Sequence, residues 1–283
     1  MNRTRAEDEV SARTALLRAS AFAAPVAAML FAGPFVSGQG TQRTLVAVWA
    51  HGDDEGAAAP VLARYAREGA HVYMIIATDG AQGGAHTSIP RGPELARARA
   101  DEARCAAEAL GINAAILLGF PDAHLGDYME DPGRLFQVTA RVQAELQRLR
   151  PDALITWGPD GGTGHPDHRL VSSIVTQLVR AGAPGAPERL FYASIPVEGF
   201  RAMNPARGEP PFLVPTAKHF SVRVPFAAAD LEASRRSMAC HKTQFSDEIV
   251  QRVSEAMSGA LKGELPLDPL IPTAATTNDL FAN

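Results

Sequence analysis

Short apolar runs alternate with longer amphipathic stretches along most of the chain, which indicates strands followed by helices. Runs typical of strands buried on both faces stand at 45–50, 71–77, 114–118 and 153–157. Helical patterns occupy 55–68, 93–110 and 132–149, and another begins at Pro166. The alternation predicts an α/β fold whose mostly parallel sheet is covered by helices on both faces. The helix at 132–149 is expected to carry on its apolar side Phe136, Val138, Val142 and Leu146.

The C-terminal third continues the pattern with further strands and helices. Strands are expected at 189–193 and 219–224, and helices at 227–241 and 246–262. From about residue 263 the chain is rich in proline and almost uncharged, so we expect an extended tail lying over the surface. No internal repeat and no long linker divides the sequence, so residues 39–283 are predicted to form one domain.

The first 38 residues differ in composition from the rest of the chain. Arg13 and Arg18 precede an uncharged, alanine-rich stretch at 19–42, and Val36-Ser37-Gly38 offers small residues for cleavage. This pattern resembles a secretory signal peptide and predicts an exported protein, periplasmic or secreted. The alternative is a disordered or poorly packed arm of a cytoplasmic enzyme. A membrane-spanning helix is disfavoured because the segment is weakly apolar for its length, so no stable span is expected in the mature chain.

Charge and cysteine content narrow the function classes. The chain has 283 residues, a net charge of −4 and no cluster of lysine and arginine, which argues against a nucleic-acid partner. A small, roughly neutral substrate fits better. Cys105 and Cys240 are too few for a disulfide framework or a thiolate zinc site, and Cys105 is interpreted as a small core residue. The sequence leaves the oligomeric state open.

Two polar clusters follow apolar runs, and they carry the candidate chemistry. The first, His51-Gly52-Asp53-Asp54-Glu55, comes directly after the run at 45–50. The second, His165-Pro166-Asp167-His168, lies at a helix start after the run at 153–157. Ligands bind at the carboxyl ends of the strands in folds of this kind, so both clusters stand where a site is expected.

Together the clusters can supply a metal site. A catalytic divalent metal of the zinc type takes about three ligands from histidine and carboxylate and leaves one position for water. His51, Asp54 and His168 could be these ligands, and Asp53 is then a spare carboxylate that could take a proton from the water. His165 would be free to stabilise an oxyanion or to donate a proton. A His/Asp site binds several first-row metals, so the metal stays open between zinc and its neighbours.

Two acids of the clusters have simpler interpretations. Asp167 could orient one of the two histidines of the second cluster, or it could accept hydrogen bonds from backbone N–H groups at the helix start. Glu55 is interpreted as a first-turn acid that favours the helix dipole.

The same residues resemble the motifs of a known family. The first cluster is similar to the A-H-P-D-D-E motif of the PIG-L (LmbE-like) deacetylases, and the second to their H-P-D-H motif. The similarity extends from about Thr44 to Gln244 and includes Thr78-Asp79-Gly80, Arg99-Ala100-Asp101-Glu102, Leu118-Gly119-Phe120-Pro121-Asp122 and His241-Lys242-Thr243-Gln244. The resemblance implies a Rossmann-like three-layer fold. It also implies zinc-dependent removal of an N-acetyl group from an N-acetylglucosamine-type sugar or glycoconjugate.

Residue by residue, the resemblance implies a role for each member of the clusters. His51, Asp54 and His168 are expected to bind zinc, Asp53 to act as the general base, and His165 to stabilise the oxyanion or act as an acid.

The resemblance extends to the substrate pocket, with two departures. Arg99 and Asp122 fall where the family lines its sugar pocket, and the alternative for each is an ion pair on a helix face or in a loop. Gly52 replaces the usual proline of the first motif and should loosen the loop. Ala81 stands where the T-x-G-E loop has glutamate, so any polar contact of that glutamate is absent.

Two other functions stay open on the sequence alone. The chain could be a non-catalytic sugar-binding or partner-binding member whose altered loops at Gly52 and Ala81 have lost turnover. Alternatively, the chain could be a metal-dependent hydrolase of a different bond, such as a phosphoester. Few basic residues stand near the clusters to hold a phosphate, and Arg169 is the nearest.

Overall fold

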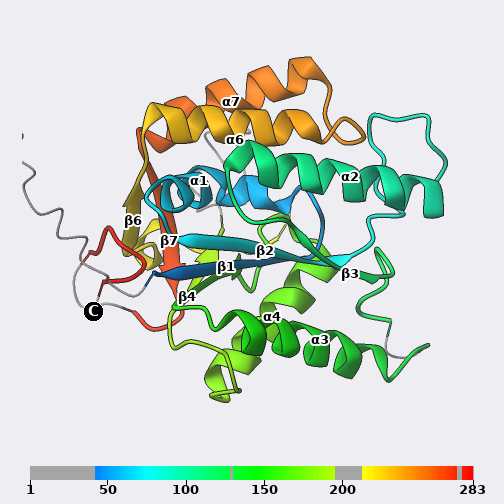
Figure 1. Cartoon of the computed structure of the whole chain (residues 1–283), viewed down its shortest axis with the longest axis horizontal. Coiled ribbons are helices and arrows are strands. Elements are labelled where there is room, and N and C mark those ends of the chain that lie inside the picture. The colour runs from blue at the N-terminus through cyan, green and yellow to red at the C-terminus, as the bar shows by residue number, and fades with distance from the viewer. Residues whose placement is uncertain (1–41, 128–129, 195–211, 273–275, 283) are drawn as a thin grey trace, which may run out of the picture. The chain divides into compact units, whose positions relative to one another are not determined.

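The computed structural model describes residues 42–127, 130–194, 212–272 and 276–282 (Figure 1). The segment predicted to be a signal peptide or arm lies outside these ranges. The described sheet has the strand order β3-β2-β1-β4-β5-β7-β6. Its strands are β1 (Thr44–Trp49), β2 (His71–Thr78), β3 (Ile116–Phe120), β4 (Ala153–Trp157), β5 (Leu190–Ala193), β6 (Val222–Pro225) and β7 (Glu264–Pro269). The helices are η1 (Asp54–Ala57), α1 (Ala59–Arg67), α2 (Pro93–Leu110), α3 (Arg134–Leu149), α4 (Pro166–Arg180), η2 (Ala217–His219), α6 (Ala228–Cys240) and α7 (Asp247–Leu261).

Five strands form a parallel block with β1 at its centre. β1 pairs with β2 and β4, β2 pairs with β3, and β4 pairs with β5, all in parallel. Residues Leu45–Trp49 of β1 are fully buried, as expected for a parallel strand covered on both faces. Helices occupy the crossovers that parallel strands require. The predicted α/β class is confirmed.

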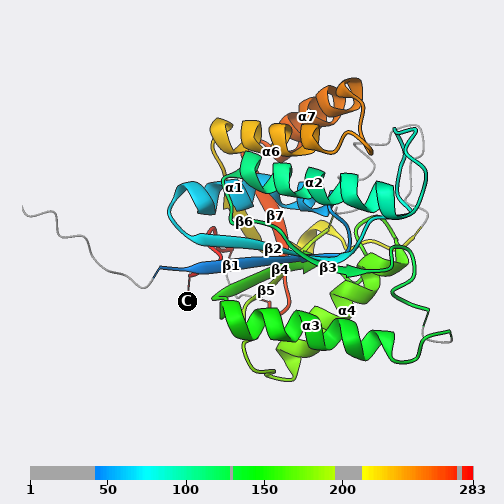
Figure 2. The ribbon, with the colours of Figure 1, turned by 45° about the vertical axis from the view of Figure 1, so that its right-hand side comes forward.

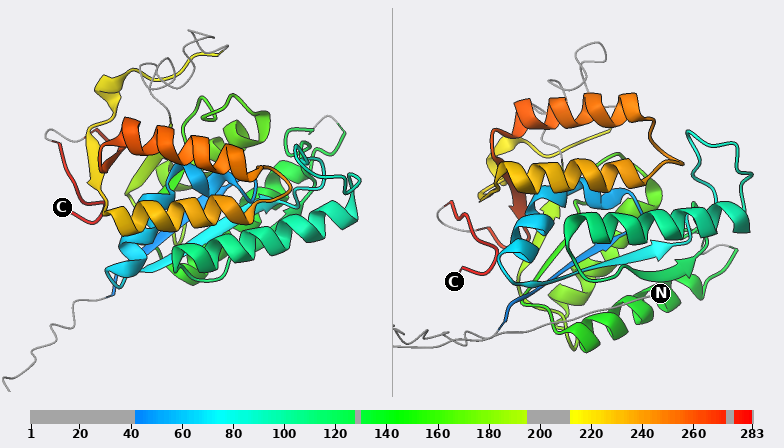
Figure 3. Two further views of the ribbon diagram at one scale, coloured as in Figure 1. Left: turned by 90° about the horizontal axis from the view of Figure 1, so that it is seen from above. Right: turned by 45° about the horizontal axis from the view of Figure 1, so that its top comes forward.

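Alternate residues of β1 point to opposite faces of the sheet, as the two-residue period of a strand requires. Leu45, Ala47 and Trp49 pack in one core with α1, α2 and α6, whereas Val46 and Val48 pack in a second core with α3 and α4. Figure 2 shows these two groups of helices on opposite sides of the sheet. Figure 3 shows α7 alongside α6. The three-layer expectation is confirmed.

Several elements differ from their predicted extent. The helix expected over 55–68 is divided into η1 and α1, because Pro60 belongs in the first turn of a helix and so marks a new start. The strand expected at 114–118 is shifted to β3, and the strand expected at 219–224 is shortened to β6, because its first residue, His219, ends η2.

The predicted apolar side of α3 is wrong at one residue. Val138, Val142 and Leu146 are fully buried, but Phe136 is 74% exposed. Two residues correspond to about 200° of rotation around a helix, so Phe136 and Val138 cannot share a face. Phe136 therefore lies outside the core that holds the rest of the helix.

The predicted surface tail is also wrong, because residues 264–269 form a strand inside the sheet. β7 lies between β5 and β6 and is antiparallel to both, with Leu265 and Leu267 buried. Pairing with β6 covers Glu264–Leu267, and pairing with β5 covers Asp268 and Pro269. Most of β7 therefore pairs on one side only, so its prolines, which have no N–H to donate, are tolerated there.

The interpretation of Cys105 as a core residue is wrong. Cys105 is exposed on α2 and forms a disulfide with Cys240, the last residue of α6. The two Cα atoms lie 5.8 Å apart although 135 positions separate them along the chain. The pairing depends on the packing of α2 against α6, and the number of cysteines does not predict that packing.

The strand order places both polar clusters at one crevice. β2 lies on one side of β1 and β4 on the other, so the connections after β1 and β4 lead away from each other. In open parallel sheets this reversal leaves a crevice at the carboxyl ends of the strands, where ligands bind. Within the described residues, no helix combines the length and the apolar character that crossing a bilayer requires.

Candidate metal centre and active site

The loops after β1 and β4 bring three predicted ligands together. His51 Nδ1 lies 2.9 Å from His168 Nε2, and Asp54 Oδ1 lies 3.1 Å from His168 Nε2 and 3.7 Å from His51 Nδ1. Ligand atoms around a tetrahedral zinc ion, each about 2.0–2.2 Å from the metal, are separated by roughly 3.3 Å. The three atoms therefore have the types and the spacing that one small divalent cation requires.

A second atom of each predicted ligand is fixed by the protein. Asp54 Oδ2 accepts hydrogen bonds from the backbone N–H groups of Ala50 and His51, at 3.0 and 2.9 Å. His168 Nδ1 lies 2.8 Å from the carbonyl oxygen of Gly161, and His51 Nε2 lies 3.1 Å from Asp122 Oδ1. These partners assign a proton to the outer nitrogen of each ring, which leaves the inner lone pairs directed at one point.

The ring of His168 is also held from its face. The indole ring of Trp157, the last residue of β4, stacks on it with centroids 4.7 Å apart and planes 7° from parallel. Gly162 makes room for this stack, because a Cβ there would lie 2.2 Å from Trp157 Cζ3. Gly162 also has a φ of 64°, which favours glycine. The glycine-rich sequence after β4 thus shapes the position of a predicted metal ligand.

The electrostatics of the trio favour a cation. Burial lowers the pKa of His51, but hydrogen bonds to Asp122, Asp167 and Asp54 outweigh this effect and raise the pKa to about 12. Burial raises the pKa of Asp54, yet His168 and His51 hold it well below its usual value. Burial also raises the pKa of Asp122, and His51 and the N–H of Gln82 lower it to about 2. The negative surroundings that hold a proton on His51 also favour a divalent metal.

Two other sets of possible ligands overlap with the trio among the described residues. One joins His165 to His51 and His168, and the other joins Asp122 and Asp167 to His51, each with one atom per residue within 4.8 Å of the others. In the first set, His165 Nδ1 already accepts a hydrogen bond from the N–H of Asp167. In the second, His51 would have to give up its hydrogen bond to Asp122. The trio of His51, Asp54 and His168 requires no such loss.

Asp53, the predicted base, forms an ion pair with Arg99 of α2. Its Oδ1 accepts a hydrogen bond from Arg99 Nη2 at 2.6 Å, and its side chain is 21% exposed. Arg99 is only 5% exposed and also donates from Nη1 to the carbonyl oxygen of Gly83, at 3.1 Å. The ion pair leaves one oxygen of Asp53 for another partner. The guanidinium of Arg99 therefore binds groups of the protein itself, and its predicted contact with a sugar stays a prediction.

His165 lies against the two histidines that are predicted to bind the metal. Its ring centroid is 4.7 Å from that of His51 and 5.0 Å from that of His168. Burial lowers its pKa, and the charges of His51 and His168 lower it further. Because Nδ1 accepts the N–H of Asp167, the proton of the neutral ring belongs on Nε2, which can donate to a ligand.

Asp122 and Asp167 both face His51. Asp122 Oδ2 also accepts the N–H groups of Gln82 and Gly83, so this buried carboxylate links His51 to the loop after β2. Its predicted place in a sugar pocket is untested. Asp167 Oδ2 lies 3.7 Å from His51 Nε2, and its oxygens accept the N–H groups of Ala123 and Leu125. Asp167 thus binds backbone N–H groups of a different loop and faces the histidine of the other cluster.

Glu55 is not the simple first-turn acid that the sequence suggests. Its Oε1 lies 2.5 Å from Ser237 Oγ and 2.8 Å from His241 Nε2, and these side chains of Glu55 and His241 are each 1% exposed. Burial lowers the pKa of His241, but the charge of Glu55 and the hydrogen bond to it raise the pKa above its usual value. In the sequence, the family-like motif His241-Lys242-Thr243-Gln244 marks His241 as a residue of interest. It does not show that His241 contacts Glu55.

Two further residues of that motif support the same region. Thr243 donates from its backbone N–H and its hydroxyl to Glu102, both at 2.7 Å. Gln244 donates to the carbonyl oxygen of Gly83 at 2.6 Å, the same oxygen that Arg99 contacts. The segment after α6 is therefore tied to α2 and to the loop after β2.

Comparison with known proteins agrees with this arrangement of residues. A family model described as PIG-L: GlcNAc-PI de-N-acetylase matches residues 46–179, which include the three predicted ligands and the predicted base. A 1D-myo-inositol 2-acetamido-2-deoxy-alpha-D-glucopyranoside deacetylase from Catenulispora acidiphila is 30% identical over an alignment of 244 positions, which covers 72% of this chain and 80% of that protein.

Solved structures share the fold at low identity. N,N'-diacetylchitobiose deacetylase from Pyrococcus horikoshii has a TM-score of 0.57 and 18% identity, over 81% of this chain and 84% of that one. The 4-carboxy-2-hydroxymuconate hydratase from Pseudomonas putida has a TM-score of 0.59 and 15% identity, over 84% of this chain and 100% of that one. Since one fold carries both activities, the function has to be argued from the site.

Proposed function

Because the chain belongs to the PIG-L (LmbE-like) family, we propose that it hydrolyses the N-acetyl amide of an N-acetylglucosamine-type sugar or glycoconjugate. The observation that carries the proposal is the meeting of His51 Nδ1, Asp54 Oδ1 and His168 Nε2 at the crevice between β1 and β4. Asp53 directly precedes Asp54 in the first loop, and the ring centroid of His165 in the second lies 4.7 Å from that of His51. These two residues have the chemistry for proton transfer and oxyanion binding.

We propose that His51, Asp54 and His168 hold a zinc ion. Two imidazoles and one carboxylate suit zinc, although other first-row divalent metals accept the same donors. When bound, such an ion lowers the pKa of a coordinated water towards about 7 and polarises the acyl oxygen. Asp122 would keep the ring of His51 in place, as its 3.1 Å contact with Nε2 supports.

The two proton-handling residues have distinct parts in the proposal. Asp53 accepts the proton of the attacking water on the oxygen that Arg99 does not hold. Arg99 orients that carboxylate, since its guanidinium is fixed at the same time to Gly83. His165 donates from Nε2 to the oxygen of the amide as negative charge develops there. This assignment follows from the N–H of Asp167, which occupies Nδ1.

The proposed substrate is a neutral N-acetylated sugar. The Catenulispora acidiphila relative is named for an acetamido-glucopyranoside of inositol and the Pyrococcus horikoshii structure for diacetylchitobiose. Arg99 and Asp122 are proposed to line the sugar pocket, with Ala81 in place of the family's glutamate. Because a glutamate side chain is absent at that position, we expect weaker selection of the sugar's hydroxyl groups.

We also propose that the protein works in an oxidising compartment outside the cytoplasm. The predicted signal peptide motivates the proposal, and the Cys105–Cys240 disulfide supports it, because disulfides persist mainly in such compartments. The mass of the protein recovered from the periplasm or the medium tests it. A chain shortened by about 38 residues is expected, whereas full-length protein confined to the cytoplasm would refute export.

The activity is tested by metal analysis together with acetate release from a panel of N-acetylated sugars, including N-acetylglucosaminyl-inositol and N,N'-diacetylchitobiose. We expect about one zinc per chain and acetate release from at least one sugar. Asp53→Ala is the matched variant, and it should retain the metal and lose the activity. Bound metal with no acetate release from any sugar would favour the non-catalytic binding role.

A further inference from the structure

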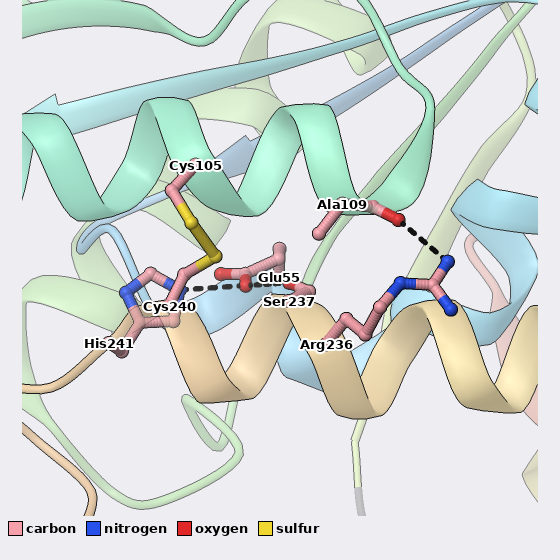
Figure 4. Close-up of a disulfide and its surroundings, with 7 residues drawn as sticks. All are labelled: Glu55, Cys105, Ala109, Arg236, Ser237, Cys240 and His241. Atoms are coloured by element: carbon pink, nitrogen blue, oxygen red, sulfur yellow. Dashed lines mark hydrogen bonds and ion pairs between the residues drawn. A yellow bond between two sulfur atoms is a disulfide. The ribbon is translucent and has the colours of Figure 1, made fainter.

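The disulfide lies next to the buried support of the acid loop, by which we mean Asp53, Asp54 and Glu55. Cys240 ends α6 and is followed at once by His241, which contacts Glu55 (Figure 4). Ser237, one turn earlier on α6, contacts the same carboxylate oxygen. The acid loop is therefore held by the last turn of α6, which is the turn that the disulfide joins to α2.

The residues that contact Glu55 are buried, so water cannot take the place of a lost hydrogen bond to its carboxylate. Glu55, His241 and Ser237 are at most 1% exposed. Glu55 Oε2 has no hydrogen-bond partner among the described residues. A buried carboxylate with only two partners depends strongly on both of them, because an unpaired buried charge is costly. Movement of the end of α6 would therefore disturb Glu55 and, next to it, Asp54.

The other cysteine stands on the helix that holds the rest of the acid loop. Cys105 lies one turn after Glu102 on α2, and Glu102 binds Thr243 twice. Arg99, one turn before Glu102, holds Asp53. The disulfide thus joins the helix that positions Asp53 to the helix that positions Glu55.

We propose that the Cys105–Cys240 disulfide positions the acid loop, through His241 and Glu55, for metal binding by Asp54. This inference rests on the metal site of the proposed function. The bond forms when the two thiols lose two electrons and two protons to an oxidised dithiol partner, which is reduced to its dithiol form. In the reduced protein, α6 and α2 are held only by packing and hydrogen bonds, and the acid loop loses affinity for the metal.

The experiment compares the oxidised protein with the same protein reduced by tris(2-carboxyethyl)phosphine under native conditions, and with the double variant C105S/C240S. The first measurement is the affinity for Zn²⁺, by competition with a chromophoric chelator. We expect a loss of about tenfold or more, the size typical of losing a group that supports a metal ligand. The second is hydrogen exchange in the peptide covering 51–57, which should become faster. The melting temperature should fall by about 10 °C.

The control is Arg236→Ala, which removes another link between the same helices. Arg236 Nη2 donates to the carbonyl oxygen of Ala109 at 3.4 Å and has no part in the support of Glu55 (Figure 4). This variant should keep the zinc affinity and the exchange rate of the oxidised protein. A double-cysteine variant that melts earlier but keeps both would overturn the proposal and leave the disulfide a stabilising link. If the oxidised protein binds no zinc, the proposed function fails, and the exchange rate still decides whether the disulfide positions the loop.

Discussion

The two loops that form the site are supported in different ways. His168, after β4, is held by residues close to it in sequence, through the carbonyl oxygen of Gly161 and the stacked ring of Trp157 at the end of β4. The loop after β1 sends each of its acids to a different part of the fold. Asp53 contacts α2, Asp54 contacts His168 on α4, and Glu55 contacts the end of α6.

This difference separates local from remote control of one site. Changes that disturb His168 should come mainly from residues close to it in sequence, whereas the acid loop should respond to changes on helices far along the chain. The position of a ligand in the first loop is therefore a property of the packed domain. Substitutions that act on one loop and spare the other test this view.

The largest effect is expected at Asp53, the carboxylate proposed to take a proton from the attacking water. Asp53→Asn keeps the size of the side chain but removes its ability to accept a proton. We expect kcat for acetate release to fall about 10²–10⁴-fold, with the zinc content unchanged. Parallel rate and metal measurements check this. A variant with a rate within a few fold of the parent would remove Asp53 from the role of base.

The next effect is expected at His165. Asparagine can still accept the N–H of Asp167 at the start of α4, but it lacks the imidazole Nε2. We expect His165→Asn to lower kcat about 10²-fold with little change in melting temperature. Steady-state kinetics and a thermal melt test both parts. A raised KM with an unchanged kcat would show that His165 only binds the substrate.

Within the loop after β4, Gly162→Ala should disturb the metal ligand. The new Cβ would lie 2.2 Å from Trp157 Cζ3, so the indole and the stacked ring of His168 must shift. We expect the zinc affinity to fall about tenfold and the protein to lose about 1–3 kcal/mol of stability. Chelator competition and chemical unfolding measure these effects.

A matched control for that change lies just after the end of α4. Gly182 has a similar φ of 59°, but a Cβ there meets nothing within 4 Å. Gly182→Ala should therefore show only the cost of the backbone conformation, about 1 kcal/mol, with an unchanged zinc affinity. Equal effects of the two variants on zinc affinity would refute local support of His168 by Trp157.

The smallest effect is expected at the start of α6, far in sequence from the turn that holds Glu55. Asp230 is buried and accepts two hydrogen bonds from Arg67 and one from the N–H of Ala227. Burial raises its pKa, but these partners hold the pKa below its usual value. Asp230→Asn should cost about 1 kcal/mol near pH 7, a modest figure because Arg67 is half exposed.

The pH dependence gives that prediction a sign. Because the pKa is lowered in the folded protein, the stabilisation is present above the unfolded-state value of about 4 and disappears as the pH falls through the folded-state value. The difference between Asp230→Asn and its parent should therefore shrink between about pH 5 and pH 3. Urea unfolding at several pH values measures it. A difference that stays constant would mean that the charge of Asp230 does not stabilise α6.

The features that the sequence predicts are those set by neighbours along the chain. The parallel strands, the covering helices and the trio of His51, Asp54 and His168 follow from apolar runs that end in polar loops, because the carboxyl ends of parallel strands share one edge. β7 is missed because prolines suggest a tail, although its alternating leucines are buried once β6 lies beside them.

The missed contacts depend on tertiary packing. Glu55 resembles an ordinary first-turn acid, and its partner His241 lies 186 positions away. The same holds for the disulfide, whose cysteines are brought together only when α6 packs on α2. The sequence places His51 and Asp122 at separate strand ends, but only the folded sheet shows that they touch.

The proposed activity depends most on one cation that is shared by the two loops. A crystal structure of the zinc-loaded protein, with anomalous scattering at the zinc edge, tests it directly. We predict a single strong peak about 2.0–2.2 Å from His51 Nδ1, Asp54 Oδ1 and His168 Nε2. A peak held instead by Asp122 and Asp167 on the other side of His51, or no peak near these loops, would contradict the account.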